Sequence, residues 1–282
     1  VVPPSCLPKP AWPPTFGAAN AVRLAIAILA AVAAIAMLVP SLCIRERDYI
    51  ASVPVRTKAF SSLFKSFGNK QFRRFVYADV IYFFAVTLFQ TGLAFYITRL
   101  MHASESNTFL LTVVMTVVSL CLYPVVNRLA PKFGKKRIII VGFFAYAAVF
   151  LITSICGEGL WWGYLIAVLA GVPMAILGIL PQAVVADIAE ADACTYGEQR
   201  SGMFFAARTF AMKLGQALSL LIFTSVTVYD SPLRYRITAI IATVCCIIGA
   251  VLFFFYNEKS VMDIIAVPAD TPTPEHDTEE TP

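Results

Sequence analysis

The chain has 282 residues, of which 59% belong to the apolar set AVILMFWYC and only 14% are Asp, Glu, Lys or Arg. A soluble domain is about 45–50% apolar and about 25% charged, so the excess apolar surface must face lipid. This composition argues against a soluble enzyme or a nucleic-acid-binding protein. The formal net charge is +5, and in a membrane protein the placement of the positive charges matters more than their sum.

Residues that carry catalytic or metal chemistry are scarce. The seven cysteines form no CxxC pair and match no zinc or disulfide spacing, so we expect reduced structural thiols. The two histidines, His102 and His276, lie far apart in the sequence, which argues against a histidine metal site or a Ser-His-Asp triad. We therefore expect no enzyme activity, no metal and no organic cofactor.

Seven segments approach the roughly 20 apolar residues that a membrane-spanning helix needs. They are residues 22–44, 75–98, 108–127, 138–156, 160–186, 204–228 and 235–257. The expected organisation is a Pro-rich extracellular segment (1–20), a transmembrane helix (21–44), a basic cytoplasmic loop (45–74), a six-helix bundle (75–257) and a disordered acidic cytoplasmic tail (258–282). The predicted fold class is an all-α membrane protein with seven transmembrane helices.

The positive charges are divided unequally between the two sides of this arrangement. Fifteen Lys and Arg residues lie on the side that holds the 45–74 and 128–137 loops, and five lie on the other side. The excess of positive charge marks the cytoplasmic side. The sequence therefore predicts a plasma-membrane (inner-membrane) protein with its N-terminus outside and its C-terminus in the cytoplasm.

Lys213 is the strongest functional signal, because charges within a span usually face a protein interior or a water-filled cavity. It follows Phe204 by nine residues, which places it about 13 Å into its helix. Thr209 and Gln216 lie at i−4 and i+3 from it and share one polar stripe. Such a stripe suits hydroxyl groups or an anion in a wet cavity. The alternative is a lysine that snorkels to the headgroups or pairs with a carboxylate for stability.

Other charged residues near the spans have two open interpretations. Arg208 lies about 140° around the helix from Lys213 and points either to the site or to the headgroups. Asp79 lies near the cytoplasmic end of its span. It either has a functional role or is merely solvated or paired with a loop cation. Asp187, Glu190, Asp192 and Glu198 form an acidic cytoplasmic loop before the sixth span. That loop is either solvated, pairing with the basic loops, or a network of ion pairs that gates the site.

The stretch ADIAEADACTYGEQRSGMFFAARTFAMK (186–213), with PQAVV before it, resembles the glycoside-pentoside-hexuronide:cation symporters, the melibiose permease type of the major facilitator superfamily. FGNKQFRRF and YPVVNRLAPKFGKKR resemble the lead-in to the seventh helix and the loop between the eighth and ninth helices of that family. The resemblance implies that the seven spans correspond to helices six to twelve of a major facilitator fold. It also implies that the N-terminal half is missing.

The resemblance further implies a secondary active transporter that carries a sugar or glycoside together with Na⁺ or H⁺ by alternating access. Lys213 and Thr209 match positions at the family's sugar and cation site, and Gln216 and Arg208 join them as candidate substrate-binding residues. Asp79, Asp187 and Glu190 are the candidates for cation binding or gating. Arg208 replaces an amide residue and Gly178 a sugar-stacking tryptophan of melibiose permease, so the identity of the sugar stays open.

Two further interpretations follow from the residues themselves. Seven spans with an outside N-terminus fit a seven-helix receptor or a retinal protein, although a retinal lysine belongs on the last helix and Lys213 lies on the sixth. A non-transporting membrane subunit that pairs with a separate N-terminal half is the other alternative. The lipid bilayer, a small solute and that N-terminal half are the expected partners, and no nucleic acid is expected.

Overall fold

The computed structural model describes residues 18–43, 66–101, 106–197, 200–228 and 231–266. The chain divides into two compact units, Val1–Val55 and Arg56–Pro282. Within the first unit, helix α1 (Ala18–Cys43) carries an apolar stretch from Arg23 to Val39 that is shorter than the other candidate spans. Its described side chains are exposed, and no other helix of this unit lies within the described residues to cover them.

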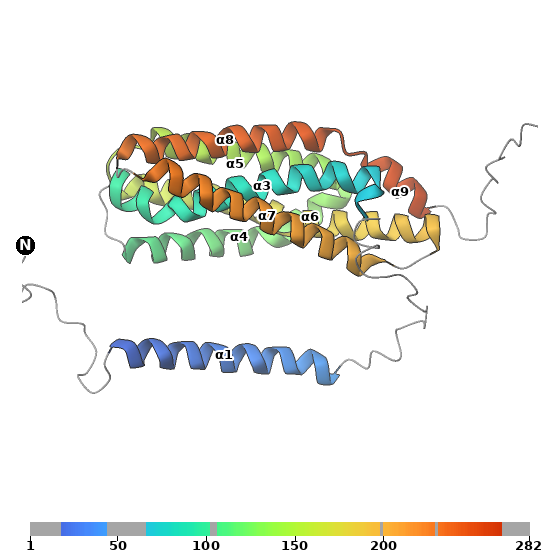
Figure 1. Cartoon of the computed structure of the whole chain (residues 1–282), viewed down its shortest axis with the longest axis horizontal. Helices are drawn as coiled ribbons and strands as arrows, with labels where there is room; N and C mark the ends of the chain where they lie inside the picture. Colours follow the sequence, from blue (N-terminus) through green and yellow to red (C-terminus); the bar gives the residue numbers. More distant parts are fainter. Residues whose placement is uncertain (1–17, 44–65, 102–105, 198–199, 229–230, 267–282) are drawn as a thin grey trace, which may run out of the picture. The chain divides into compact units, whose positions relative to one another are not determined.

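The second unit is a helical bundle (Figure 1). Its helices are α3 (Lys70–Phe95), a π-helical turn η3 (Tyr96–Leu100), α4 (Ser106–Phe133), α5 (Lys135–Ile155), α6 (Leu160–Tyr196), α7 (Ser201–Thr227), α8 (Pro232–Phe254) and α9 (Glu258–Ala266). Six of them, α3 to α8, are long and apolar enough to cross a membrane. Together with the exposed apolar side chains of the bundle, they define an integral membrane protein.

The packing follows one order of neighbours around the bundle. Helix α8 packs between α3 and α5, α6 packs against α4 and α5, and α7 packs against α3. Helices α4 and α7 therefore have one principal neighbour each. Only 22% of the most apolar window of α4 or of α7 is buried, against 44–56% for the other four spans. Among the residues that the structure describes, these two helices leave broad faces that no other helix of the bundle covers.

Glycines allow α4 and α7 to approach their partner helices closely. A Cβ atom built on Gly215 of α7 would lie 2.8 Å from the backbone oxygen of Val80 in α3. A Cβ atom on Gly171 of α6 would lie 2.5 Å from a methyl group of Val118 in α4. Small residues at membrane helix interfaces let backbones approach in this way. The open helices α4 and α7 are thus each held closely by one partner.

Several expected boundaries were wrong, and α4 for example continues to Phe133, inside the expected 128–137 loop. Helix α6 does not end at residue 186 but continues to Tyr196, because Gly197 at φ 68° adopts the left-handed conformation that terminates a helix. The acidic residues Asp187 and Glu190 therefore lie on a helix and not in a loop. Helix α3 begins at Lys70, inside the expected 45–74 loop, because the Asn69 side chain accepts hydrogen bonds from two backbone N–H groups of its first turn.

The expected disordered tail, residues 258–282, begins with helix α9. Its buried Val261 and the apolar Ile264 and Ile265 recur at i, i+3 and i+4, and α9 packs against α6. Residues 267–282 of the predicted tail lie outside the described residues. So do residues 1–17 of the Pro-rich segment and 44–65 of the basic loop.

Candidate functional site

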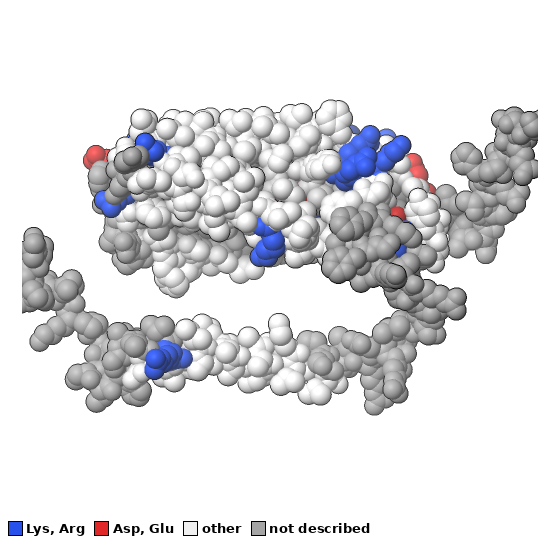
Figure 2. Space-filling view, in the orientation of Figure 1, with Lys and Arg blue, Asp and Glu red and all other residues white. Residues whose placement is uncertain are grey.

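Lys213 lies near the middle of α7, a helix of 27 residues. Its side chain is exposed in the bundle, Thr209 is exposed beside it, and Gln216 is half-buried. Figure 2 shows basic atoms at mid-length of α7 on a face that is otherwise uncharged. The Thr209 hydroxyl donates to the carbonyl oxygen of Phe205 at 2.8 Å and keeps its lone pairs free to accept from a ligand.

The surroundings of Lys213 are apolar. The neighbouring side chains Phe210 and Leu214 are each 57% exposed and Leu218 is 52% exposed. Within the described residues, no carboxylate lies within ion-pair distance of Lys213. An ammonium at mid-span costs about 2.5–3.5 kcal/mol when lipid surrounds it. The exposed face of α7 therefore suits contact with water or with further protein better than contact with acyl chains.

Arg208 lies on the opposite side of α7 and reaches α3. Its Nε and Nη2 donate to the two carboxylate oxygens of Asp79 at 2.8 and 3.2 Å. The side chains are only 8% and 4% exposed. The Arg208 guanidinium carbon also lies 5.8 Å from the ring centroids of both Phe75 and Phe83. Neither headgroup exposure of Arg208 nor solvation of Asp79 is observed. The pair lies between α3 and α7, and Arg208 does not join the stripe of Lys213.

The aromatic part of this contact escaped sequence reasoning. Phe75 and Phe83 lie at i−4 and i+4 from Asp79, so all three side chains emerge on one face of α3. The two rings present their faces to a guanidinium and supply cation–π contact while excluding water. The pattern Phe-x3-Asp-x3-Phe was the signal available in the sequence. It did not say which cation, 129 residues away, would complete the contact.

The acidic residues near the end of α6 bind within the bundle. Asp187 pairs with Lys135 of α5 at 2.5 Å. Asp192, another member of the expected acidic loop, pairs with Arg200 at 2.8 Å and accepts from Asn69 at 3.3 Å. These contacts connect α6 with the starts of α5, α3 and α7. They stiffen one end of the bundle, whereas Glu190 is exposed and has no such partner among the described residues.

Helix α9 also binds the start of α5 at this end of the bundle. Glu258 of α9 accepts backbone hydrogen bonds from Lys135 and Lys136 at 2.8 and 2.9 Å and so caps the first turn of α5. Close by, Tyr256 is buried outside the spans. Burial first, and then the negative charges of Asp187 and Glu258, raise the pKa of its phenol well above the ordinary value. The neutral phenol is therefore strongly favoured in the folded chain.

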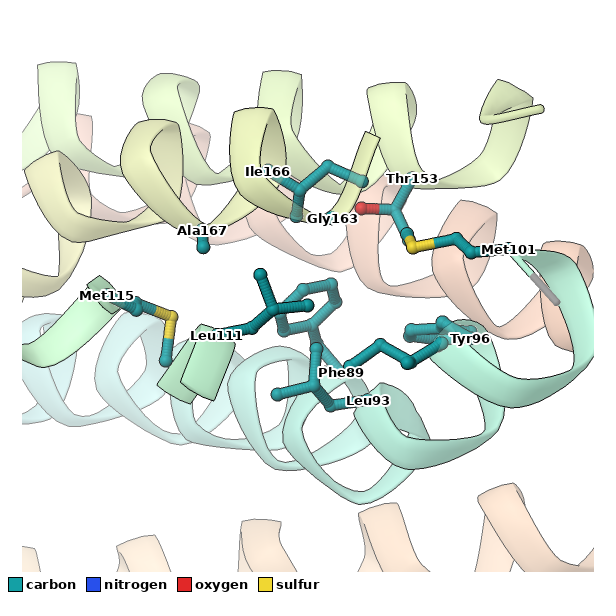
Figure 3. Close-up of a pocket in the computed structure, with 11 residues that line it drawn as sticks. Phe89, Leu93, Tyr96, Met101, Leu111, Met115, Thr153, Gly163, Ile166 and Ala167 are labelled. Atoms are coloured by element: carbon teal, nitrogen blue, oxygen red, sulfur yellow. The ribbon is translucent and has the colours of Figure 1, made fainter. Parts of the chain in front are cut away.

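The pocket near the other end of the bundle is apolar (Figure 3). Side chains of α3, α4 and α6, including Phe89, Leu111 and Ile166, line it. Its two hydroxyl groups are engaged elsewhere: Thr153 donates to Val149 at 2.9 Å, and Tyr96 shares a 2.9 Å hydrogen bond with Thr238. A sugar needs several convergent polar groups, which this lining lacks, so the pocket is a poor candidate for a sugar site.

The bundle of six long apolar helices defines an integral membrane protein, and Lys213 lies near the middle of one of these helices on an exposed face. The sequence model of the family described as MFS/sugar transport protein matches residues 15–259. The chain therefore belongs to this family of major facilitator transporters. A comparison with curated proteins found no match.

Proposed function

We propose that this protein carries a sugar or glycoside across the membrane together with Na⁺ or H⁺, as a symporter of the melibiose permease type. The family match supports transport of a small solute. The exposed Lys213 beside Thr209 on α7 supports a site for hydroxyl groups. A lysine ammonium donates to sugar hydroxyls and a threonine hydroxyl both donates and accepts, so the stripe offers the mixed donors and acceptors that a sugar needs.

We further propose that a second helical bundle packs over the uncovered faces of α4 and α7. The low burial of these two helices supports this arrangement, as does the mid-span position of Lys213. A second bundle would place the lysine in a cavity between two halves, where rocking of one half against the other exposes the site alternately to the two sides. It would also supply the acidic groups for cation coupling, since Asp79 is already paired with Arg208.

The roles of the other candidates follow from their contacts. Gln216 extends the stripe by one turn and remains a proposed substrate contact. The Asp79–Arg208 pair holds α7 against α3 and so positions the stripe, whereas Asp187 is tied to Lys135 within the bundle. Glu190 is the exposed acid at the cytoplasmic end and keeps its proposed gating role. We also keep the proposed orientation, with the C-terminus in the cytoplasm of a cell whose plasma membrane holds the protein.

Uptake into proteoliposomes tests this proposal. The chain is reconstituted alone and together with the N-terminal half of a related symporter, and a panel of sugars and glycosides is screened with Na⁺ and pH gradients applied separately. We expect Lys213→Ala to abolish gradient-driven uptake and to leave membrane insertion unchanged. Leu220→Ala, two helical turns from Lys213 on the same exposed face of α7, is the matched control and should transport normally. Normal accumulation by Lys213→Ala would refute the proposed role.

A further inference from the structure

A cleft with a basic lining lies where three spans end. Helix α4 ends at Phe133, α5 begins at Lys135 and α8 ends at Phe254. The cleft opens between these ends and α9. Figure 2 shows that Lys and Arg gather at the end of the bundle where α8 gives way to α9. The cleft therefore lies at the boundary between the apolar spans and a basic surface.

The charges of the cleft favour an anion. Four cations line it, Lys132, Lys136, Arg137 and Lys259, against the two acids Glu258 and Asp263. Both oxygens of Glu258 accept backbone N–H groups of α5, and even with both acids counted the lining keeps an excess of positive charge, four cations against two acids. Within the part of the chain that the structure describes, Lys132, Arg137 and Lys259 have no ion-pair partner.

One cation of the cleft is already fixed in place. The Nζ atom of Lys136 donates to the backbone carbonyl oxygen of Phe254 at 2.8 Å and lies 5.1 Å from the centroid of the Phe254 phenyl ring. This contact uses one of its three N–H donors, so the ammonium keeps donors for a ligand. A fixed donor lowers the entropy lost when an anion binds. The exposed Lys132 and Arg137 lie on either side of the α4–α5 turn and complete the group.

Apolar side chains share the same lining. Phe133 is 57% exposed and Phe254 is 67% exposed, and Ile140 and Met262 also line the cleft. Exposed phenyl rings at the ends of spans contact acyl chains more favourably than water. A soluble anion would use the cations and leave these rings without a partner. An amphiphile uses both surfaces at once.

We propose that this cleft binds the headgroup of an anionic phospholipid, with the phosphate among Lys132, Lys136 and Arg137 and the acyl chains against Phe133 and Phe254. Basic pockets between the ends of spanning helices attract anionic headgroups by direct charge contact. The bound lipid would contact α4, α5 and α8 together and so stabilise this end of the bundle. The site is separate from the face of α7 that carries Lys213, and the proposal does not depend on the transported solute.

Native mass spectrometry tests the proposal by counting the lipids that stay bound to the full chain. The chain is released from detergent that contains phosphatidylglycerol and phosphatidylcholine in equal amounts. The unmodified chain should retain phosphatidylglycerol in preference. One surface cation changes the affinity for an anionic lipid by about fivefold, so the double variant K132Q/R137Q should bind phosphatidylglycerol about 25-fold more weakly. Arg73→Gln removes an exposed cation of α3 at the same end of the bundle, outside the cleft. This control should stay within about twofold of the unmodified chain, since it lacks contact with the lipid.

The remaining arms separate a lipid site from its alternatives. The charge-preserving variant K132R/R137K should keep the preference, which excludes misfolding as the cause of any loss. Equal losses in K132Q/R137Q and Arg73→Gln would overturn the proposal in favour of diffuse attraction. No loss in K132Q/R137Q would overturn it outright. Displacement of phosphatidylglycerol by excess inorganic phosphate would also overturn it and would assign the cleft to a soluble anion.

Discussion

The buried pair between α3 and α7 leads to an asymmetric prediction. Removing one partner of a buried ion pair costs about 3–5 kcal/mol, because the other charge is left without compensation. The two partners differ in whether they can lose their charge when the other is removed. A carboxyl group becomes neutral by taking up a proton, whereas a guanidinium stays charged at every accessible pH. Removal of Asp79 should therefore be more damaging than removal of Arg208.

The burial and the contacts of the pair set the expected losses of unfolding free energy. Asp79→Val leaves a guanidinium, 8% exposed, without the two carboxylate contacts at 2.8 and 3.2 Å, and should cost about 3–5 kcal/mol of unfolding free energy. Arg208→Met leaves a carboxyl group that is protonated in place, so the loss should be about 1–3 kcal/mol, as for an unsatisfied buried polar group. The double variant should recover most of the loss, because hydrophobic replacement of a whole buried pair is often neutral.

Unfolding in mixed micelles with increasing SDS, followed by the helical circular dichroism signal, measures these free energies. Asp79→Asn is the matched control for volume: it keeps the shape and removes the charge, and should be nearly as costly as Asp79→Val. The reasoning is refuted if the losses of unfolding free energy in the two single variants are additive. If the double variant loses the sum of the two single losses, the residues act independently and the pair does not hold α7 against α3.

Two further outcomes test the packing and the pH response. Gly215→Ala should displace α7 and lower the thermal unfolding temperature, because the new Cβ would lie 2.8 Å from a backbone oxygen of α3. The control is Gly202→Ala on the same helix, where a Cβ meets nothing within 4 Å, and this variant should be neutral or slightly stabilising in the same measurement. Tyr256 has a raised pKa, so its stabilising contribution is complete below its ordinary value of 10.0 and is lost as pH rises toward the folded-state value. Tyr256→Phe should remove that alkaline loss in unfolding titrations, and an unchanged profile would contradict it.

The spans were predictable from the sequence because their lengths and apolar composition are local properties. Six expected spans coincide with helices of the bundle. The ends were harder to predict, although local signals existed. Gly197 stops α6 and Asn69 starts α3, and both are residues favoured at helix termini. Helix α9 was missed because the acidic and Pro-rich average of the tail concealed a short amphipathic pattern around Val261.

The candidate site was predictable only in part. The shared stripe of Thr209, Lys213 and Gln216 follows from helical periodicity, and α7 is a continuous helix through all three. The pairing of Arg208 with Asp79 joins positions 129 residues apart. One sequence contains no record of which distant helices will touch. Helical geometry predicted that Arg208 and Lys213 point in different directions, and only the packing of α7 against α3 shows which of the two is buried.

The two cations of α7 therefore have different physical explanations. Arg208 is neutralised inside the bundle by Asp79, so folding of this unit alone accounts for its burial. Lys213 has no carboxylate partner among the described residues, and stability of this unit gives no reason for an ammonium at mid-span. Residues that break a rule of folding without local compensation are expected at functional sites. The compensation for Lys213 must then come from outside this bundle: from water or lipid headgroups that the long side chain reaches, from a bound solute, or from the second bundle that we propose.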